Sequence, residues 1–537
     1  MRKGTIYNIV LAVIAVMLSV NVYAQQKPRL VVNIVISSMH RNDITRYADN
    51  FSAGGFNRLL KEGVVFNNAS YNYMQTTTPV SLATLSTGAM PSTHGIISAE
   101  WYDYINNKRV SLINDEKEQS IKFSSATGKY SPRNLLAQTL SDALAKQNPQ
   151  SQVATIAITP LSAVVMNGHK GIVYWMEEQK SHWTTSSYYT TELPAWVENY
   201  NQENINQIYK LLRWNPLFSY DRYHNSQVSK IEGIHSKAGK KVDFVGTNAV
   251  PDIVTPIQHM QYTPAGNSAT IAFAKQVMAK MNMGKDENPD MLNIVLDTPR
   301  FIAETFGPES VEYEDMLYRL DKDLEDFIIF AQAQVGSTEN LVITITSDHG
   351  TSPSYNAPTA PQERFNVMQA EVIINAFLGS QYGNGNWVLG YIDRNIYLNH
   401  NLIYEKKLNV ADIQYDVATF AMQLRGVSHA IPAEALRNSY FGSGYALKMQ
   451  NGFYPKRSGD VVINLMPGWI EERTAIRSTS GSMYLYDTEV PLIIFGAGLR
   501  PRIEQEDVDM IDFAPTLADI IGIWAPTASE GETLDIK

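Results

Sequence analysis

Residues 72–95 read NYMQTTTPVSLATLSTGAMPSTHG, and this is the most informative stretch of the chain. A run of threonines ends at Pro79, which suits the start of a helix because Thr caps helix N-termini and Pro is tolerated in the first turn. A second motif, TSDHG, occupies residues 346–350, and a third, DMIDFAPTLADIIG, occupies residues 509–522. All three motifs contain hydroxyl or carboxylate groups, and two of them add an imidazole.

Short apolar runs alternate with helical patterns along the chain. The apolar runs are typical of buried strands in a parallel sheet, and they lie at 30–36, 152–158, 291–296, 341–346 and 490–495. The helical patterns lie at 55–61, 132–146, 311–334 and 511–521. This alternation predicts an α/β fold with a doubly wound, mostly parallel sheet flanked by helices.

A sheet of this kind places its site beyond the carboxyl ends of the strands. Three of the expected strand ends carry polar residues, namely 37–38, 297–300 and 347–349. Two stretches interrupt the alternation: residues 175–285 are rich in Tyr, Trp, Asn and Gln, and residues 355–460 mix strands and helices with polar loops. Both are predicted to be inserted cap regions that shape access to the site, with simple lid packing as the alternative.

The N-terminus has the pattern of a secretory signal peptide. Arg2 and Lys3 precede an apolar run at residues 9–20, and Val22-Tyr23-Ala24 places small residues at the two positions that a signal peptidase reads. The run is short for a membrane span, so we predict a signal peptide at 1–24, a mature chain at 25–537 and no transmembrane anchor after cleavage. We therefore expect an exported protein, in the periplasm or at the cell surface.

Charge and cysteine content narrow the function classes. Loss of Arg2 and Lys3 takes the formal net charge from −10 to −12, which disfavours nucleic-acid binding. The chain has no Cys, so disulfides and thiolate metal sites are excluded. Any metal ion must be held by Asp, Glu, His or hydroxyl oxygen.

Taken together, the three motifs resemble the alkaline phosphatase superfamily. The similarity is closer to exported, single-chain alkaline phosphatases with a Thr nucleophile, because three further segments also look like this subfamily: 128–135 (GKYSPRNL), 188–196 (YYTTELPAW) and 454–460 (YPKRSGD). The resemblance covers about residues 29–522 and implies an alkaline-phosphatase-like fold. It also implies a site with two Zn²⁺ ions that activate the nucleophile and stabilise the leaving oxygen.

The resemblance places Thr78 at the nucleophile position, and Asp348 and His349 at two of the six metal-ligand positions. The other four positions are substituted, by Ser37, Arg300, Glu304 and Ser480. Three positions that contact phosphate in this subfamily are substituted as well, by Ala99, Thr159 and Leu161. Arg300 stands where an Asp is implied, which changes the local charge by two units against metal binding.

We therefore predict a degenerate metal site with no cofactor, or at most one Zn²⁺ or other divalent ion on Asp348 and His349. No base for Thr78 is visible at a recognisable spacing, and its helix-capping role is the structural alternative. Arg300 is expected to pair with Asp348. Asp297 is either a shifted metal ligand or a cap at its strand end.

The resulting hypothesis is a catalytically impaired pseudophosphatase that serves as a binding or assembly subunit. Its partner would be an envelope protein, a glycan or a lipid headgroup. The alternative is a divergent metal-dependent phosphomonoesterase or phosphodiesterase with Thr78 as the nucleophile, in which Arg300 binds the anion. A sulfatase-like enzyme is disfavoured, because the C/S-x-P-x-R motif of that family is absent.

Overall fold

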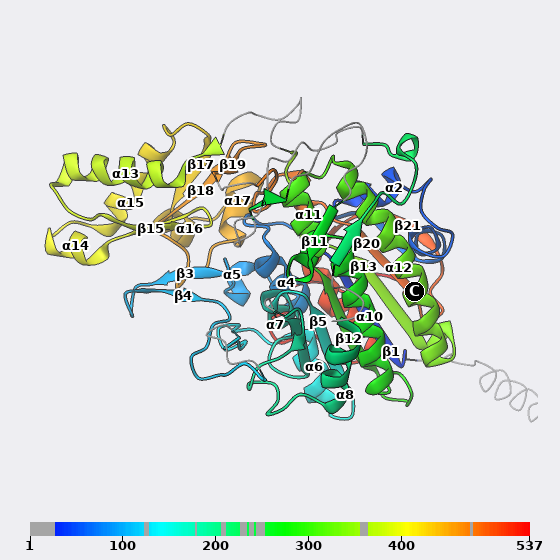
Figure 1. Cartoon of the computed structure of the whole chain (residues 1–537). Helices are drawn as coiled ribbons and strands as arrows, with labels where there is room; N and C mark the ends of the chain where they lie inside the picture. The colour runs from blue at the N-terminus through cyan, green and yellow to red at the C-terminus, as the bar shows by residue number, and fades with distance from the viewer. Residues whose placement is uncertain are drawn as a thin grey trace, which may run out of the picture.

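The computed structural model describes residues 27–122, 128–177, 180–205, 211–225, 234–235, 241–242, 253–354, 364–472 and 476–536. The predicted signal peptide at 1–24 lies outside these residues. The described chain forms a large sheet covered by helices and a smaller lobe beside it (Figure 1). No helix among the described residues is long and apolar enough to cross a membrane.

The large sheet has nine strands and is mostly parallel, which confirms the predicted fold class. Parallel pairing joins β21 to β2 and runs from β13 through β1, β12 and β5 to β6, whereas β20 is antiparallel to both its neighbours and β7 to β6. In spatial order the strands are β21 (Arg502–Asp509), β2 (Val64–Ser70), β20 (Leu492–Gly496), β13 (Leu341–Thr346), β1 (Leu30–Ile36), β12 (Asp290–Leu296), β5 (Val153–Ala157), β6 (Ile172–Met176) and β7 (Trp183–Thr184).

The central strands are buried on both faces, so their sequences are apolar almost throughout. A short chain of polar side chains crosses them. Asn33 donates to Asn293 Oδ1 at 2.8 Å, Asn293 donates to Thr155 Oγ1 at 3.0 Å, and Thr344 donates to Asn33 Oδ1 at 3.0 Å. Because buried polar groups need partners, this row of hydrogen-bonded side chains fixes the register of β13, β1, β12 and β5.

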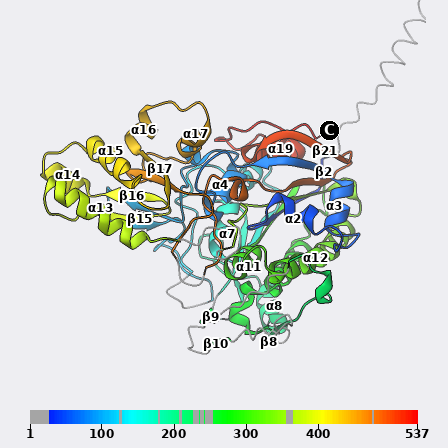
Figure 2. The same ribbon diagram turned by 90° about the horizontal axis from the view of Figure 1, so that it is seen from above.

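Successive residues of β1 point into two different cores. Val32 and Ile34 lie in the core beneath one layer of helices, and Val31 and Val35 lie in the core beneath the other. The first layer contains α2 (Arg41–Arg46), α3 (Phe56–Glu62), α10 (Ala265–Lys280), α11 (Thr298–Phe306) and α12 (Val311–Val335). The second contains α4 (Thr78–Thr87), α6 (Leu140–Gln147), α7 (Pro160–Asn167) and α19 (Phe513–Ile521). Figure 2 shows α4, α7 and α19 from above.

The helix predicted at residues 132–146 begins eight residues late. The residues from 132 to 139 form turns and irregular chain, and α6 starts at Leu140. Thr139 accepts a hydrogen bond from the Asp142 N–H, and the Asp142 carboxylate accepts one from the Thr139 N–H. This reciprocal capping box fixes the first turn of α6 at that point.

The lobe at the left of Figure 1 has its own sheet and core. Its strands, in spatial order, are β15 (Val388–Ile392), β16 (Asn395–Leu398), β18 (Val461–Leu465) and β17 (Val427–Pro432). Its helices are α13 (Val367–Tyr382), α14 (His400–Glu405), α15 (Val410–Ala421), α16 (Ala433–Asn438) and α17 (Gly444–Asn451). The lobe occupies the second stretch where an insertion was expected, of which residues 355–363 lie outside the described residues.

The first expected insertion, 175–285, is described only in part. Its beginning contributes β7 to the large sheet, and its end forms α10, whose Phe273 and Met278 are fully buried in a core of that sheet. Both ends of this stretch therefore belong to the main domain rather than to a cap. Its middle includes the residues from 226 to 233, 236 to 240 and 243 to 252, which lie outside the described chain.

Asp460 connects the lobe to the main domain. Its buried carboxylate accepts hydrogen bonds from the Leu398 N–H at 2.8 Å and from Gln414 Nε2 at 2.7 Å, and it lies 2.8 Å from His400 Nε2. It also accepts a hydrogen bond from Tyr104, which follows strand β3 (Glu100–Asp103) and stacks on the His400 ring. One carboxylate thus fixes groups from three lobe elements, β16, α14 and α15, and from a hairpin outside the lobe.

Candidate functional site

The candidate site lies at the edge of the large sheet where β1, β12 and β13 end. Ser37 follows β1, Asp297 follows β12, and Asp348 follows β13 after one intervening residue. Helix α4 points its N-terminus at the same place, and Thr78 is its first residue. Neighbouring parallel strands end side by side, so residues up to 311 positions apart in sequence, such as Ser37 and Asp348, come into contact.

The Asp348 carboxylate is fully buried, and both of its oxygens have donors. Ser37 Oγ donates to Oδ2 at 2.7 Å, and the Ser38 N–H donates to Oδ1 at 3.1 Å. The backbone of Ser38 has φ of +61°, in the left-handed region that non-glycine residues rarely adopt. The loop after β1 therefore holds a strained conformation in which it satisfies this carboxylate from two sides.

His349 is equally buried and contacts the threonine. Its Nδ1 donates to the Gly350 carbonyl at 2.6 Å, which leaves Nε2 as the acceptor of the ring. Thr78 Oγ1 lies 3.1 Å from Nε2, and Ser480 Oγ and Asp348 Oδ2 lie 3.4 Å from it. The expectation that Thr78 has no paired base is therefore wrong, because the fold places an imidazole nitrogen within hydrogen-bonding distance of its hydroxyl.

The helix-capping explanation for Thr78 is also wrong. The N-cap of α4 is Thr77, and Thr78 is the first helical residue, so its hydroxyl is directed to His349 instead of to the helix. Neither threonine provides a side-chain cap for α4.

Arg300 lies on α11 beside Thr78, with 21% of its side chain exposed. Its Nη1 pairs with Glu304 Oε1 one turn later at 3.4 Å, and no ion pair in the described chain joins Arg300 to Asp348, so the predicted pairing with Asp348 is wrong. Burial disfavours the charged guanidinium, but the carboxylates of Glu304, Asp297 and Asp348 outweigh it and raise the Arg300 pKa above its ordinary value. Arg300 is thus a fixed cation that balances several nearby anions.

Asp297 caps its strand end. The fully buried carboxylate accepts a hydrogen bond from the Thr159 N–H at 2.9 Å and another from Ser162 Oγ at 2.5 Å. Burial raises the pKa of Asp297, while Arg300 and these hydrogen bonds oppose the rise. Thr159 is in turn the N-cap of α7, and its hydroxyl accepts from the Ser162 N–H at 3.3 Å. Both side chains are occupied in holding the start of α7.

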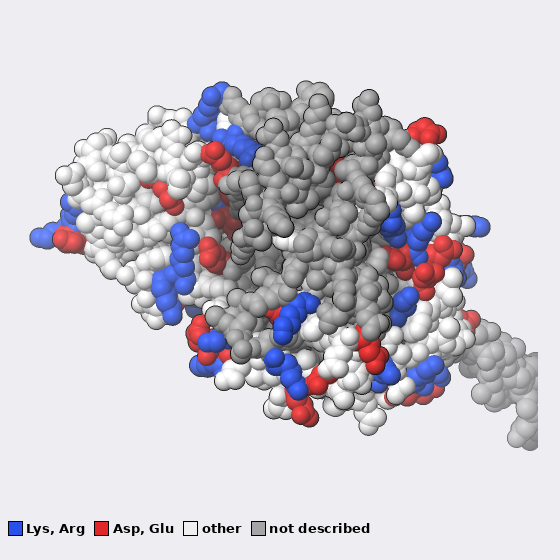
Figure 3. Space-filling model, in the orientation of Figure 1, with Lys and Arg blue, Asp and Glu red and all other residues white. Residues whose placement is uncertain are grey.

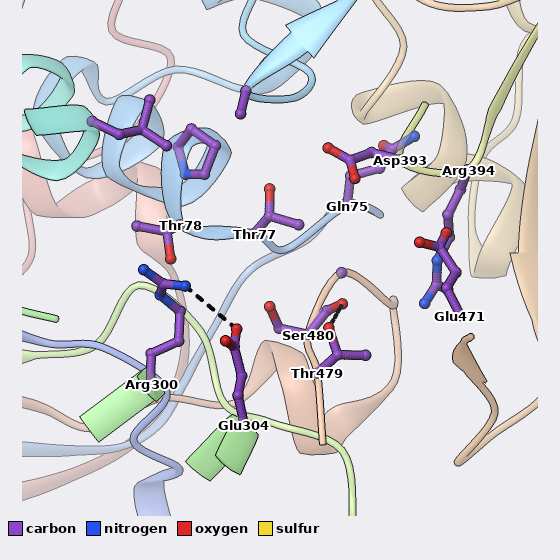
Figure 4. Close-up of a pocket in the computed structure, with 14 residues that line it drawn as sticks. Gln75, Thr77, Thr78, Arg300, Glu304, Asp393, Arg394, Glu471, Thr479 and Ser480 are labelled. Carbon is purple, nitrogen blue, oxygen red and sulfur yellow. Dashed lines mark hydrogen bonds and ion pairs between the residues drawn. The ribbon is translucent and has the colours of Figure 1, made fainter. Parts of the chain in front are cut away.

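A pocket of about 200 Å³ opens above these residues. Figure 4 shows Thr78, Arg300 and Glu304 on one side, Asp393, Arg394 and Glu471 on the other, and Thr77, Thr479 and Ser480 between them. The residues singled out from sequence that line it are Thr78, Ala99, Leu161, Arg300, Glu304 and Ser480. Ser37, Asp348 and His349 connect to it through the hydrogen bonds of Thr78 and Ser480.

Several residues of the pocket wall were not predicted from the sequence. Thr77 and Thr479 are next to Thr78 and Ser480, and Gln75 lies in the same motif as Thr78, so proximity in sequence was a usable signal for these three. Asp393 and Arg394 form the two-residue turn between β15 and β16, and both have positive φ, +42° and +66°. Such turns usually contain Asn-Gly, and Asp-Arg at these positions is not a recognisable turn signal. Glu471 lies in a short strand of the lobe region and has no recognisable motif.

A pair of zinc ions does not fit the side chains present. Within the described ranges, no group of three or more His, Asp or Glu side chains could hold a metal ion. Hydroxyl groups and a guanidinium stand around the nucleophile position, and a structural or catalytic zinc takes three or four Cys, His or carboxylate ligands. The oxygens of Asp348 and the Nε2 atom of His349 already have hydrogen-bonding neighbours within the protein.

Replacing Arg300 by Ala tests its role as the internal cation. We expect Arg300→Ala to lower the free energy of unfolding by about 1–3 kcal/mol, because it leaves buried carboxylates without their counter-charge. Urea denaturation of both proteins measures this difference. Arg222→Ala, which removes an exposed arginine that donates to Asn50, is the matched control with a smaller expected effect. Equal stability of Arg300→Ala and the parent would contradict the counter-charge role.

The family model of the type I phosphodiesterases / nucleotide pyrophosphatases matches residues 31–479. The chain belongs to this family. The match begins in β1 and ends within the loop that carries Ser480, so it includes the elements that surround the pocket.

Similar proteins and a solved structure confirm the predicted resemblance to the alkaline phosphatase superfamily. The chain is 28% identical over 521 residues to alkaline phosphatase PafA of Elizabethkingia meningoseptica, covering 95% of this chain and 94% of the relative. It is 28% identical over 518 residues to alkaline phosphatase PhoV of Synechococcus elongatus, covering 95% and 92%. The crystal structure of wild-type PafA superposes with a TM-score of 0.87 at 27% identity, covering 95% of this chain and 98% of PafA.

Proposed function

We propose that this protein is a pseudophosphatase: a member of the phosphodiesterase family that has lost two-metal phosphoryl transfer and acts as a binding or assembly subunit. The observation that carries the proposal is the guanidinium of Arg300 beside the Thr78 hydroxyl. A two-metal mechanism needs anionic and imidazole ligands around that hydroxyl. A fixed cation there repels divalent ions and satisfies the remaining carboxylates in their place.

Two further features support the loss of hydrolysis. Among the described residues that line the pocket, Arg300 is the cation beside the Thr78 hydroxyl, and its charge is already balanced by Glu304 and neighbouring carboxylates. In addition, the pocket has Ala99 and Leu161 on its wall, and Thr159 holds the start of α7. None of these three side chains can neutralise a phosphate in the transition state.

The test is hydrolysis of 4-nitrophenyl phosphate by the purified protein, after dialysis and with added zinc. We expect a rate that zinc does not raise and that Thr78→Ala does not change. Thr45→Ala, at an exposed threonine of α2, is the matched control. Zinc-dependent turnover that disappears in Thr78→Ala and persists in Thr45→Ala would overturn the proposal.

One observation favours a second candidate, a divergent hydrolase that uses a single metal. Thr78 Oγ1 is 3.1 Å from His349 Nε2, so a nucleophile and a potential base or ligand remain together. Asp348 and His349 would hold the ion, as at most one zinc or other divalent metal, and Arg300 would bind the substrate anion. Elemental analysis separates the two candidates, because near-stoichiometric zinc that survives dialysis is expected only of the hydrolase.

The proposed partner belongs to the cell envelope, which follows from the predicted export of the chain. Figure 3 shows Lys and Arg interspersed with Asp and Glu on the visible face, in keeping with an acidic protein that does not bind nucleic acid. Mass spectrometry of the mature protein tests the export step. An N-terminus at Gln25 is expected, and an intact Met1 in the envelope fraction would contradict cleavage.

A further inference from the structure

The pocket is lined by opposite charges in near balance. Two cations, Arg300 and Arg394, face three anions, Glu304, Asp393 and Glu471. Between them lie the amide of Gln75 and the hydroxyls of Thr77, Thr78, Thr479 and Ser480. A dianion such as phosphate gains nothing from this lining, because each arginine is accompanied by a carboxylate. A neutral ligand with many hydroxyl groups finds both donors and acceptors.

The charged groups on the lobe side are held in place. Asp393 accepts a hydrogen bond from Ser98, Arg394 Nη1 donates to Asn464 Oδ1 at 3.2 Å, and Glu471 accepts from the Tyr391 hydroxyl at 2.7 Å. Fixed donors and acceptors distinguish between ligands by the positions of their hydroxyl groups, because a misplaced hydroxyl leaves a buried polar group unpaired.

The turn that carries Asp393 and Arg394 is strained. Two consecutive non-glycine residues have positive φ there, whereas Asn-Gly adopts this turn without difficulty. Gln75, in the loop before α4, lies beside Asp393 in Figure 4, and it also has positive φ, +63°, and is 2% exposed. Strained backbone of this kind gathers where the structure must place a side chain against a ligand.

Three residues of the wall also have unsatisfied polar atoms. Gln75 Oε1, Thr77 Oγ1 and Arg300 Nε are buried, and none of them has a hydrogen-bond partner within the described chain. The Gln75 oxygen is a hydrogen-bond acceptor, the Thr77 hydroxyl can both donate and accept, and Arg300 Nε is a donor. Small side-chain movements toward a bound ligand would satisfy all three only if the ligand offers donors as well as acceptors.

We propose that the pocket binds a neutral, polyhydroxylated ligand, namely one sugar residue at the end of a glycan, without metal. Sugar hydroxyls would donate to Asp393 and Glu471 and accept from Arg394 and Arg300. A volume of about 200 Å³ suits a single ring better than a peptide segment. The inference rests on the proposed function, because a pocket loaded with two zinc ions would select a phosphate ester instead.

The experiment is saturation-transfer-difference NMR and thermal shift with the full mature protein in the presence of EDTA. The probes are the methyl glycosides of glucose, galactose, mannose and N-acetylglucosamine. Inorganic phosphate and phosphoethanolamine are the phosphate-containing competitors. We expect a saturable signal from at least one glycoside that inorganic phosphate does not displace. No signal from any glycoside, or displacement by either anionic probe, would overturn the inference.

The decisive variant is Asp393→Asn combined with Arg394→Gly. It creates the Asn-Gly turn that suits this geometry, so the hairpin should fold with unchanged or higher Tm, while affinity for the glycoside falls by about ten-fold or more. Lys407→Gly relieves the same kind of backbone strain at φ of +58° on the lobe, away from the pocket, and should leave binding unchanged. Undiminished binding by the double variant would contradict the role of the turn.

These outcomes separate the inference from the proposed function. Zinc-dependent hydrolysis that needs Thr78 would remove the proposed function. A protein that neither hydrolyses phosphate esters nor binds any of the four glycosides would retain the proposed function and remove only the sugar assignment.

Discussion

A variant with Ser37→Asp, Arg300→Asp, Glu304→His and Ser480→His is expected to bind two zinc ions and to hydrolyse 4-nitrophenyl phosphate at least about 1000-fold faster than the parent. The substitutions restore the ligand types that the resemblance to the superfamily implies at these four positions. The backbone that supports them matches wild-type PafA with a TM-score of 0.87. A factor of this size corresponds to ~4 kcal/mol of transition-state stabilisation.

The physical reason is the change in local charge. The four substitutions remove the guanidinium of Arg300 and the carboxylate of Glu304 and add two carboxylates and two imidazoles, so the surroundings of Thr78 become more negative by two charges. Without metal the variant should be less stable than the parent, because a carboxylate at position 37 would face Asp348 where a hydroxyl now donates at 2.7 Å. Thermal unfolding with and without zinc measures this effect, and we expect zinc to raise Tm strongly.

The control keeps the four substitutions and adds Thr78→Ala. It should bind zinc and lose the gained activity, which separates metal binding from catalysis. If the parent protein already binds two zinc ions, or if the four substitutions leave its metal content unchanged, the substituted positions are not the ones that determine metal binding.

Asp460→Ala is expected to lower the free energy of unfolding by about 3–5 kcal/mol. The carboxylate is 3% exposed and receives hydrogen bonds from Tyr104, the Leu398 N–H and Gln414, with His400 at 2.8 Å. Its removal leaves several buried donors unpaired at the junction between lobe and main domain. Urea denaturation followed by tryptophan fluorescence measures the loss, and limited proteolysis reports whether the lobe detaches first.

Asp416→Ala provides the comparison. Asp416 accepts a hydrogen bond from Tyr382 within the lobe, but it is only partly buried and serves one hydroxyl. Its loss should cost about 1 kcal/mol. Similar losses in the two variants would show that Asp460 acts as an ordinary hydrogen-bond acceptor and does not join the two parts of the molecule.

The fold was predictable because its strands are continuous apolar runs. The strand at 341–346 has the same limits in sequence and structure, and polar Asn33 within β1 did not disguise that strand because its neighbours are apolar. The helix at 132–146 was misplaced because apolar spacing continues upstream of the capping box at Thr139, and that box determines where the helix starts.

The site was predictable where motifs end strands. Asp348 and His349 follow the end of β13 after one residue, and the geometry of a parallel sheet brings them to Thr78. The hydrogen bond between Thr78 and His349 joins residues 271 positions apart, so no local spacing could reveal it. Arg300 pairs with Glu304 because one helical turn separates them, so the two side chains are neighbours on the surface of α11.

The hydrogen bond from Ser37 to Asp348 also limits how this pocket could regain its lost chemistry. Replacing Ser37 alone by Asp would set two carboxylates at about 2.7 Å with no ion between them. Replacing Arg300 alone would leave the nearby carboxylates without their positive counter-charge. Each of these two substitutions made alone is therefore expected to destabilise the folded protein, whereas the four made together allow metal ions to bind and offset the added negative charge. Single substitutions that lead back to a metal site are thus disfavoured, whereas substitutions that adapt the pocket to a different ligand do not meet this cost.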